Sequence, residues 1–125
     1  MWRNKKLIIT AKETNKMRDS IIEFMQDKKA KDIVILDVKK LTSLTDYFIL
    51  CTSESTPQTR AIMGHVYKKM RENGWRPNNL EDTKTLEWGA MDYFNIIVHI
   101  FNQETREYYQ FERLWGDAKI KKIDE

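Results

Sequence analysis

The spacing of apolar residues near the start of the chain predicts an amphipathic helix over residues 11–28. Met17 and Ile21 begin a series of apolar positions three or four residues apart, which places their side chains on one face of a helix. Thr10 and Glu13 in the TAKE motif have the spacing of a capping box, in which a hydroxyl and a carboxylate satisfy backbone N–H groups of the first turn. We therefore expect this helix to begin directly after Thr10.

A second helix is predicted from the segment SESTPQT at residues 53–59. Thr56 is the expected N-cap, and Pro57 suits the first helical position because a missing N–H has no partner to lose there. Gly74 is the expected stop signal, since glycine readily adopts the left-handed conformation that follows many helices. The apolar stripe of this helix consists of Ile62, Val66 and Met70.

Four runs of β-branched and aromatic residues predict strands. They are IVILDV at residues 33–38, DYFILCT at 46–52, TLEWGAMD at 85–92 and FNIIVHIF at 94–101, with a tight turn near Tyr93 between the last two. The last run is apolar on both faces, which is typical of a central strand covered from each side. These elements predict a mixed α/β fold, in which a central sheet is flanked by helices.

Composition favours a single domain over residues 1–125 in a reducing, cytoplasmic environment. The chain is long enough to bury a core, and its one cysteine, Cys51, excludes an internal disulfide framework. No apolar run approaches the roughly 18 residues of a membrane span, and the basic opening MWRNKKLIITAK is short for an organelle transit peptide. With 22 basic and 19 acidic residues the surface is mixed in charge, and we expect the tail at 119–125 to be solvated.

Residue types that carry enzyme chemistry are sparse. Cys51 and His99 both lie in apolar strand patterns, which favours a buried structural role, and with His65 they form no recognisable set of metal ligands. Neither GxGxxG nor a Walker motif is present to cradle phosphate, so no cofactor is expected.

Three carboxylates lie near the ends of predicted strands, namely Asp37, Asp46 and Asp92. Carboxylates grouped at such positions can hold a metal ion, whereas capping and turn residues are the commoner explanation. Both interpretations remain open from the sequence.

The segment EYYQFERLWGD at residues 107–117 contains more apolar side chains than the docking of one helix requires. We expect a helix from Asn102 to Gly116. Its docking stripe would consist of Tyr108, Phe111 and Trp115. Tyr109 and Leu114 would then point elsewhere.

Exposed aromatic side chains are the strongest functional signal. Tryptophan and tyrosine dominate protein–protein hot spots, because they bury a large area and keep a polar group. Trp88 on the third predicted strand and Tyr93 at its turn lie where a sheet edge and its loop are exposed. Together with Tyr109 and Trp115 they favour a protein-binding surface, while Trp88 and Trp115 fit a core position equally well.

Five segments occur together in the order and spacing of a known family: DIVILDV, TDYFILCT, GWRP, LEWGAMDYFNIIVHIF and REYYQFERLWGDA. Over residues 13–118 the chain resembles the ribosomal silencing factors, also called Iojap-like proteins. The resemblance implies a compact α/β domain whose topology is similar to that of nucleotidyltransferases, but without their catalytic motif. It therefore implies a protein that is not an enzyme.

The resemblance also implies a function. Family members bind the large ribosomal subunit through its fourteenth large-subunit protein, which lies on the face that meets the small subunit. The bound factor blocks subunit joining sterically and represses translation when nutrients are short. The matching positions imply a partner-binding site made of Trp88, Asp92, Tyr93, Arg113, Leu114, Trp115 and Gly116, with Asp46 and Tyr47 adjoining it. We further expect this apolar patch to form a homodimer when the partner is absent.

Two segments depart from the family pattern. The usual turn Asp-Tyr-Gly-Asp is here DYFN, which places Phe94 and Asn95 in the turn, and a GTSSRQV-like segment is here SESTPQT. These changes bear on loop geometry and partner affinity. Two other functions remain open, namely a nucleotidyltransferase-like enzyme that binds a nucleoside triphosphate with metal through aspartates, and an RNA-binding module based on the lysines of residues 119–122.

Overall fold

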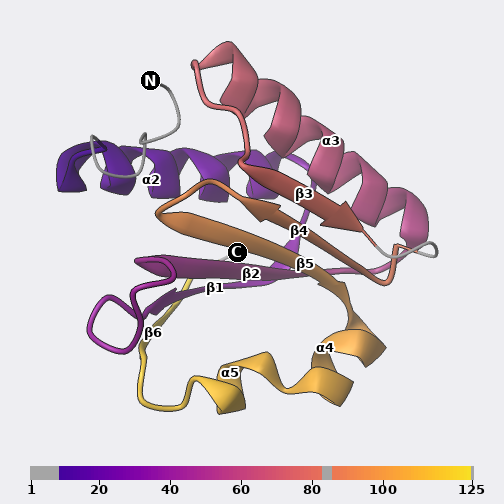
Figure 1. Cartoon of the computed structure of the whole chain (residues 1–125). Coiled ribbons are helices and arrows are strands. Elements are labelled where there is room, and N and C mark those ends of the chain that lie inside the picture. Colours follow the sequence, from indigo (N-terminus) through magenta and orange to yellow (C-terminus); the bar gives the residue numbers. More distant parts are fainter. Residues whose placement is uncertain (1–8, 83–85, 125) are drawn as a thin grey trace.

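The computed structural model, which describes residues 9–82 and 86–124, contains one six-stranded mixed sheet with helices on both faces (Figure 1). The strands are β1 (Lys31–Asp37), β2 (Tyr47–Ser53), β3 (Asn79–Asp82), β4 (Trp88–Asp92), β5 (Ile96–Asn102) and β6 (Lys119–Lys122). Their order is β3-β4-β5-β2-β1-β6; β2 and β5 pair in parallel, and the other neighbours pair antiparallel. The predicted mixed α/β architecture and the inner position of β5 are confirmed. The basic opening at 1–8 and Thr85 lie outside the described residues.

Helix α2 (Ala11–Asp27) begins with the predicted capping box. The Thr10 hydroxyl accepts a 3.0 Å hydrogen bond from the backbone N–H of Glu13, and the Glu13 carboxylate accepts one of 3.2 Å from the backbone N–H of Thr10. Helix α3 (Thr56–Glu72) contains Pro57 in its first turn. Its N-cap is Ser55, not Thr56 as predicted, because Ser55 is the extended residue whose hydroxyl reaches the backbone N–H of Gln58, at 3.1 Å.

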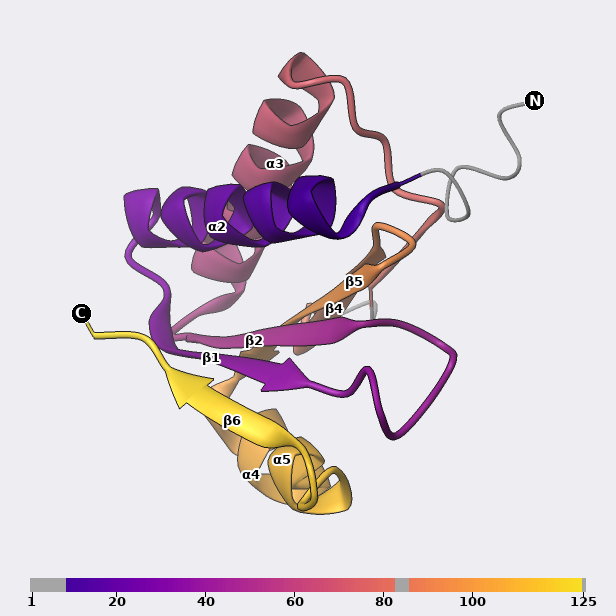
Figure 2. The ribbon, with the colours of Figure 1, turned by 90° about the vertical axis from the view of Figure 1, so that its left-hand side faces the viewer.

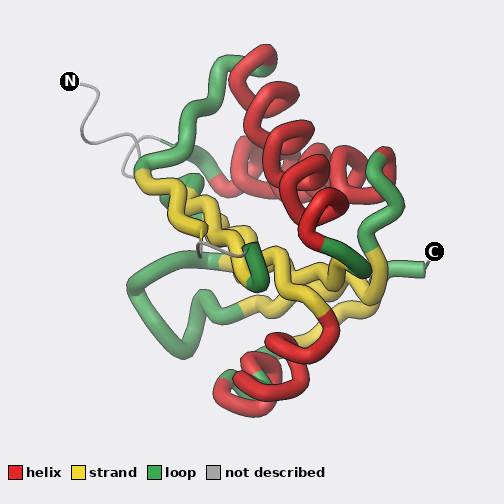
Figure 3. The backbone as a smooth tube through the Cα atoms, turned by 90° about the vertical axis from the view of Figure 1, so that its right-hand side faces the viewer, coloured by secondary structure: helices red, strands yellow, loops and turns green. Residues whose placement is uncertain are grey.

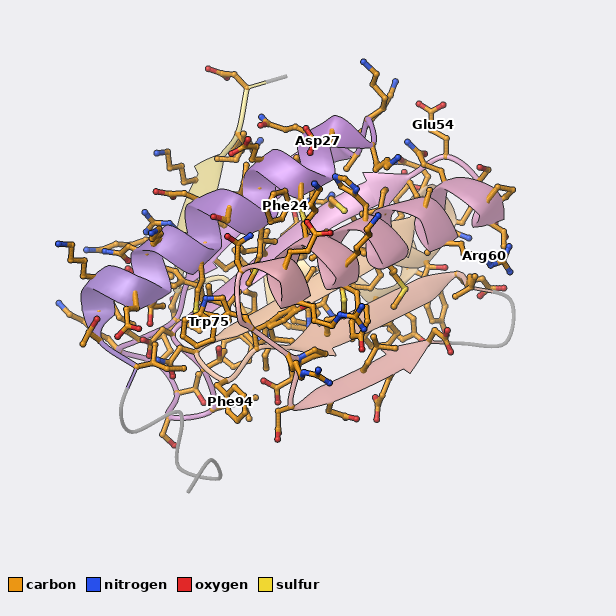
Figure 4. All side chains as sticks on the ribbon, turned by 90° about the horizontal axis from the view of Figure 1, so that it is seen from above. Phe24, Asp27, Glu54, Arg60, Trp75 and Phe94 are labelled. Carbon is orange, nitrogen blue, oxygen red and sulfur yellow. The ribbon has the colours of Figure 1, made fainter. Side chains whose placement is uncertain are left out.

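Both long helices cover the same face of the sheet, and Figure 4 shows them side by side. Phe24 and Asp27 of α2 contact His65 of α3, with ring centroids 5.9 Å apart and an Oδ2–Nε2 distance of 2.9 Å. Beneath the helices, buried side chains form the main core, which includes Met17, Ile21, Met25, Ile49, Ile62, Val66, Met70, Met91, Ile96 and Val98. Gly74 (φ 90°) follows α3 and confirms the predicted stop.

The predicted helix over residues 102–116 is broken in two, and Figure 3 shows the two short pieces on the opposite side of the strands from the long helices. Helix α4 (Gln103–Tyr109) starts at the N-cap Asn102, but Gln110 adopts a left-handed conformation (φ 47°, ψ 50°) before α5 (Phe111–Leu114). The break rotates the two pieces relative to each other, so the continuous stripe expected for one helix does not form. Phe111 packs against the sheet as predicted, whereas Tyr108 is 81% exposed and does not.

Two edge strands were not predicted. Residues 119–122 form β6, which pairs with β1 rather than extending freely into solvent (Figure 2). Backbone hydrogen bonding accounts for this, since all four side chains of β6 remain exposed, and Ile123 N–H also donates to the Ile33 carbonyl at 2.9 Å. At the other edge the four side chains of β3 are exposed too, and β3 pairs with β4. Neither strand has the apolar alternation by which a strand is recognised.

Candidate functional site

The face of the sheet opposite the long helices carries a cluster of rings. Because side chains alternate along a strand, Trp88 of β4, His99 and Phe101 of β5 and Phe48 of β2 share this face. Phe111 and Trp115, from α5 and the residue after it, pack onto them. We call these residues the aromatic cluster: Phe48, Trp88, His99, Phe101, Phe111 and Trp115.

His99 lies at the centre of this cluster. Its ring centroid is 4.6 Å from that of Phe111 and 5.6 Å from that of Phe48, and it stacks on Phe101 at 5.7 Å with an interplanar angle of 17°. The indole N–H of Trp88 donates a 3.0 Å hydrogen bond to Nδ1 of His99. Burial lowers the pKa of His99 from its ordinary value of 6.5 to about 4, so the imidazole is neutral at physiological pH.

The cluster opens to solvent along its rim. Trp88 and Trp115 are half-buried. The core position and the exposed binding position that the sequence left open therefore each hold in part, because both side chains pack on the cluster and remain partly accessible. Tyr109 packs its ring 5.1 Å from that of Trp88 and is exposed, and Leu114 is 74% exposed. We call Trp88, Tyr109, Leu114 and Trp115 the aromatic surface.

Two other residues of the terminal motif flank the aromatic surface. Arg113 and Gly116 are both exposed. Arg113 donates a 3.2 Å hydrogen bond to the side-chain oxygen of Gln110, and its carbonyl accepts one of 3.2 Å from the Gly116 N–H. The four motif residues from Arg113 to Gly116 therefore span the end of α5 and the turn after it, and all four are at least partly exposed.

Tyr93 does not belong to this surface. It was expected to be exposed at the turn after β4, but it is 0% exposed and lies in the main core under the long helices. The turn itself explains the difference: Asp92 accepts a 2.8 Å hydrogen bond from the Phe94 N–H, and Phe94 takes the left-handed position (φ 70°) at the tip. Phe94, labelled in Figure 4, is therefore the half-exposed aromatic residue of this turn.

Tyr47 also differs from expectation, because it faces the long helices and not the aromatic cluster. It is 7% exposed, and its hydroxyl lies 2.8 Å from Nζ of Lys39, 3.3 Å from Nη1 of Arg18 and 3.2 Å from Oδ1 of Asn15. Asp46 is half-buried, and its backbone N–H donates to the Asn95 carbonyl at 3.0 Å. Asp46 therefore adjoins the β4–β5 turn, while Tyr47 packs in the core on the face of the sheet that the long helices cover.

The residues considered for catalysis are buried in the core, paired with a lysine or used to cap a turn. Cys51 is fully buried, which raises the pKa of its thiol to about 12 and leaves little thiolate at neutral pH. Asp37 pairs with Lys39 at 3.2 Å, and Asp92 caps the turn at Phe94. Over residues 9–82 and 86–124, no group of three histidine, cysteine or carboxylate side chains is arranged to hold a metal ion. In that same part of the chain, no helix is long and apolar enough to cross a membrane.

Sequence reasoning missed His99 as the centre of the aromatic cluster. Its position in VHIF predicted that it is buried, but not which residue it contacts. The register of the two strands could have indicated the contact. In the antiparallel pair Trp88 lies opposite Phe101, which is two residues from His99 and on the same face.

Known proteins are similar to this chain over most of its length. A family model described as "Ribosomal silencing factor during starvation" matches residues 11–125. Ribosomal silencing factor RsfS of Bacillus subtilis is 35% identical over 98 residues, covering 78% of this chain and 83% of that protein. A mouse protein named "Mitochondrial assembly of ribosomal large subunit protein 1" is 26% identical over 100 residues, covering 78% of this chain and 44% of that protein.

A solved structure supports the same relationship. The crystal structure of a Chromobacterium violaceum protein superposes with a TM-score of 0.79 at 35% identity, covering 82% of this chain and 85% of that chain. The family model spans all the described helices and strands, and the relatives match in both sequence and fold. This chain belongs to the ribosomal silencing factor family.

Proposed function

We propose that this protein binds the large ribosomal subunit through its fourteenth large-subunit protein and sterically blocks subunit joining, which represses translation under nutrient limitation. Members of the family are ribosome-associated regulatory factors and not enzymes. The name of the mouse relative, which refers to assembly of the large ribosomal subunit, supports the choice of subunit. The proposal places the protein in the cytoplasm with its ribosomes.

The aromatic surface is the observation that carries the proposal. Trp88, Tyr109, Leu114 and Trp115 combine accessible apolar area with a rigid base in the aromatic cluster. Anchors of this kind dominate protein interfaces, and one of them contributes about 2 kcal/mol or more to an interface that buries roughly 800 Å² on each partner. Steric exclusion of the small subunit requires only occupancy, so no reaction is needed.

Partner binding would use the accessible part of the matched motifs. The proposed contact residues are Trp88, Asp92, Arg113, Leu114, Trp115 and Gly116, with Asp46 at the margin. Tyr93 and Tyr47 are buried on the other face, and their proposed contribution is to hold the turn and strand that carry the contact residues. Phe94 stands at the turn where the family has glycine, so it adds apolar area beside Asp92 and is a proposed source of altered affinity.

The same apolar area supports a homodimer in the absence of the ribosomal partner. An exposed patch of this kind favours a symmetric contact with a second copy, and a dimer that used the aromatic surface would compete with the ribosome. Analytical ultracentrifugation of wild type and of Leu114→Ser tests this point, because the dimer should weaken in the variant.

Co-sedimentation with purified large ribosomal subunits tests the proposed function. Wild type should sediment with large subunits and should reduce the formation of joined ribosomes when small subunits are added. Trp88→Ala should lose both effects while keeping its circular dichroism spectrum. Failure of the wild type to bind would refute the proposal.

Salt dependence separates protein recognition from RNA recognition. Binding through phosphate contacts of the three lysines at 119–122 would weaken as salt rises from 50 to 200 mM, by roughly 20- to 40-fold if each lysine contacts one phosphate. Binding centred on aromatic side chains should change much less. A steep loss together with unchanged binding of Trp88→Ala would favour the RNA-binding alternative.

A further inference from the structure

We infer that His99 is a positioning residue, which fixes the Trp88 side chain in the orientation that the aromatic surface presents to its partner. The inference rests on the proposed function for the meaning of that orientation. The fixation itself is a property of the free protein and can be measured without ribosomes.

Trp88 is held by contacts on more than one side. Its ring stacks on Phe101 at 5.2 Å with an interplanar angle of 26°, and Tyr109 packs against it at 5.1 Å. Ring packing alone is compatible with two orientations of the indole, related by a roughly 180° flip about the Cβ–Cγ bond, because stacking has little preference for which edge points inward. The 3.0 Å hydrogen bond from the indole N–H to Nδ1 of His99 selects one of these arrangements.

His99 is suited to this task by its own surroundings. It is 7% exposed, and the rings of Phe48, Phe101 and Phe111 contact it from three elements, so its ring cannot swing away from Trp88. Because Nδ1 accepts the hydrogen bond, the proton of the neutral imidazole is assigned to Nε2. Burial keeps the ring neutral and therefore keeps Nδ1 available as an acceptor.

Packing does not by itself require histidine at this position. A leucine or phenylalanine would fill space among aromatic rings without a polar group to satisfy, and burying a polar ring is costly unless it is hydrogen-bonded. The acceptor for Trp88 is what histidine adds. A side chain that is fixed before binding loses less freedom on binding, so removing the acceptor should weaken the partner contact by about tenfold.

Two nearly isosteric substitutions separate positioning from packing. In His99→Asn the side-chain oxygen occupies a position close to that of Nδ1 and can accept from Trp88, whereas His99→Leu has no acceptor. The asparagine variant should be the less stable of the two, because its buried amide N–H groups lack partners. If stability alone set the affinity for large subunits, His99→Leu would bind more tightly than His99→Asn. Positioning of Trp88 predicts the reverse order.

The first measurement is hydrogen exchange of the indole N–H of Trp88, followed by ¹⁵N NMR and assigned with Trp88→Phe. The indole signal should be protected in wild type and in His99→Asn and should exchange at least about tenfold faster in His99→Leu. The second is affinity for large ribosomal subunits, where His99→Asn should stay within about threefold of wild type and His99→Leu should fall about tenfold. Thermal unfolding of both variants establishes which one is more stable.

The proposed function and the fixation of Trp88 can fail separately. If wild type does not bind large subunits, the proposed function fails and indole exchange alone decides the fixation of Trp88. If wild type binds and His99→Leu binds equally well, or if affinity follows stability so that His99→Asn is the weaker binder, His99 has only a structural role and the inference is overturned. Equal protection of the indole in both variants overturns it as well.

Discussion

Arg106 and Glu112 form a two-point ion pair across the break between α4 and α5, with Nε–Oε1 and Nη2–Oε2 distances of 3.1 and 3.0 Å. The remaining guanidinium nitrogen, Nη1, donates to the Asp32 carbonyl at 2.7 Å and to the Thr52 hydroxyl at 2.8 Å. One side chain thus joins both short helices to β1 and β2. Arginine suits this role because its planar group presents several donors in fixed directions.

Replacing Arg106 should therefore loosen the support of the aromatic surface. Arg106→Ala should lower the free energy of unfolding by about 2 to 3 kcal/mol, because it removes four hydrogen bonds and leaves the partly buried Glu112 unpaired. Urea unfolding at neutral pH measures the change. Arg113→Ala is the matched control: Arg113 is exposed with a single side-chain bond to Gln110, so its loss should cost less than about 0.5 kcal/mol. Equal effects of the two substitutions would contradict this account.

The four glycines include two that should respond to alanine in opposite directions. A Cβ on Gly89 of β4 would lie 2.1 Å from Sδ and 2.8 Å from Cε of Met63, a buried residue of α3, so Met63 would have to move within the core. Gly89→Ala should destabilise by about 1 to 2 kcal/mol. Gly64 lies on the exposed side of α3 with nothing near its Cβ position, and Gly64→Ala should stabilise by up to about 1 kcal/mol. Thermal unfolding of the two variants should give shifts of opposite sign.

Stability should depend on pH through His99. Its pKa is near 6.5 when unfolded and about 4 when folded, so its contribution is complete above pH 6.5 and is lost as the pH falls towards 4, because only the unfolded chain binds the proton in that range. The expected loss is about 2 kcal/mol between pH 7 and pH 5. Urea unfolding of wild type and His99→Leu at both values isolates this effect from other titrating groups. A wild type and variant with equal pH dependence would show that His99 is not the group responsible.

Leu114 should affect binding without affecting stability. Its side chain is largely exposed on the aromatic surface, so Leu114→Ser should change the free energy of unfolding by less than about 0.5 kcal/mol while weakening binding to large subunits several-fold. Leu80→Ser is the control, since Leu80 is also exposed but lies opposite Met91, on the face of the sheet turned towards the long helices. If Leu80→Ser weakened binding as much as Leu114→Ser, the partner would contact a different face.

Local signals in the sequence predicted the elements that depend on local chemistry. The capping box at Thr10 fixed the start of α2, and apolar residues on both faces identified β5 as an inner strand. The resemblance to ribosomal silencing factors, carried by motifs such as ERLWGDA, was confirmed by the family match. These features need no knowledge of distant contacts, which is why they could be read along the chain.

Features that depend on distant contacts were not predictable in this way. Gln110 adopts its left-handed conformation between two short helices, which are held on the sheet by the Arg106–Glu112 pair and by Phe111. The residues QFER contain no glycine or proline that would predict a break there. Tyr93 was assigned to the surface because it follows a strand, but the turn at Phe94 directs it into the core. The pairing of β6 with β1 depends on backbone groups, whose availability the side-chain pattern does not report.

The position of β6 also bears on how the chain behaves if it is cut. By pairing with residues Val34–Asp37 of β1, β6 occupies backbone groups of a strand that is apolar on both faces. Proteolysis before Lys119 would make β1 an edge strand with unpaired backbone N–H and C=O groups, which can pair with another chain and start aggregation. In the intact chain the exposed lysines of β6 form the edge of the sheet instead, and we expect this charged edge to oppose aggregation.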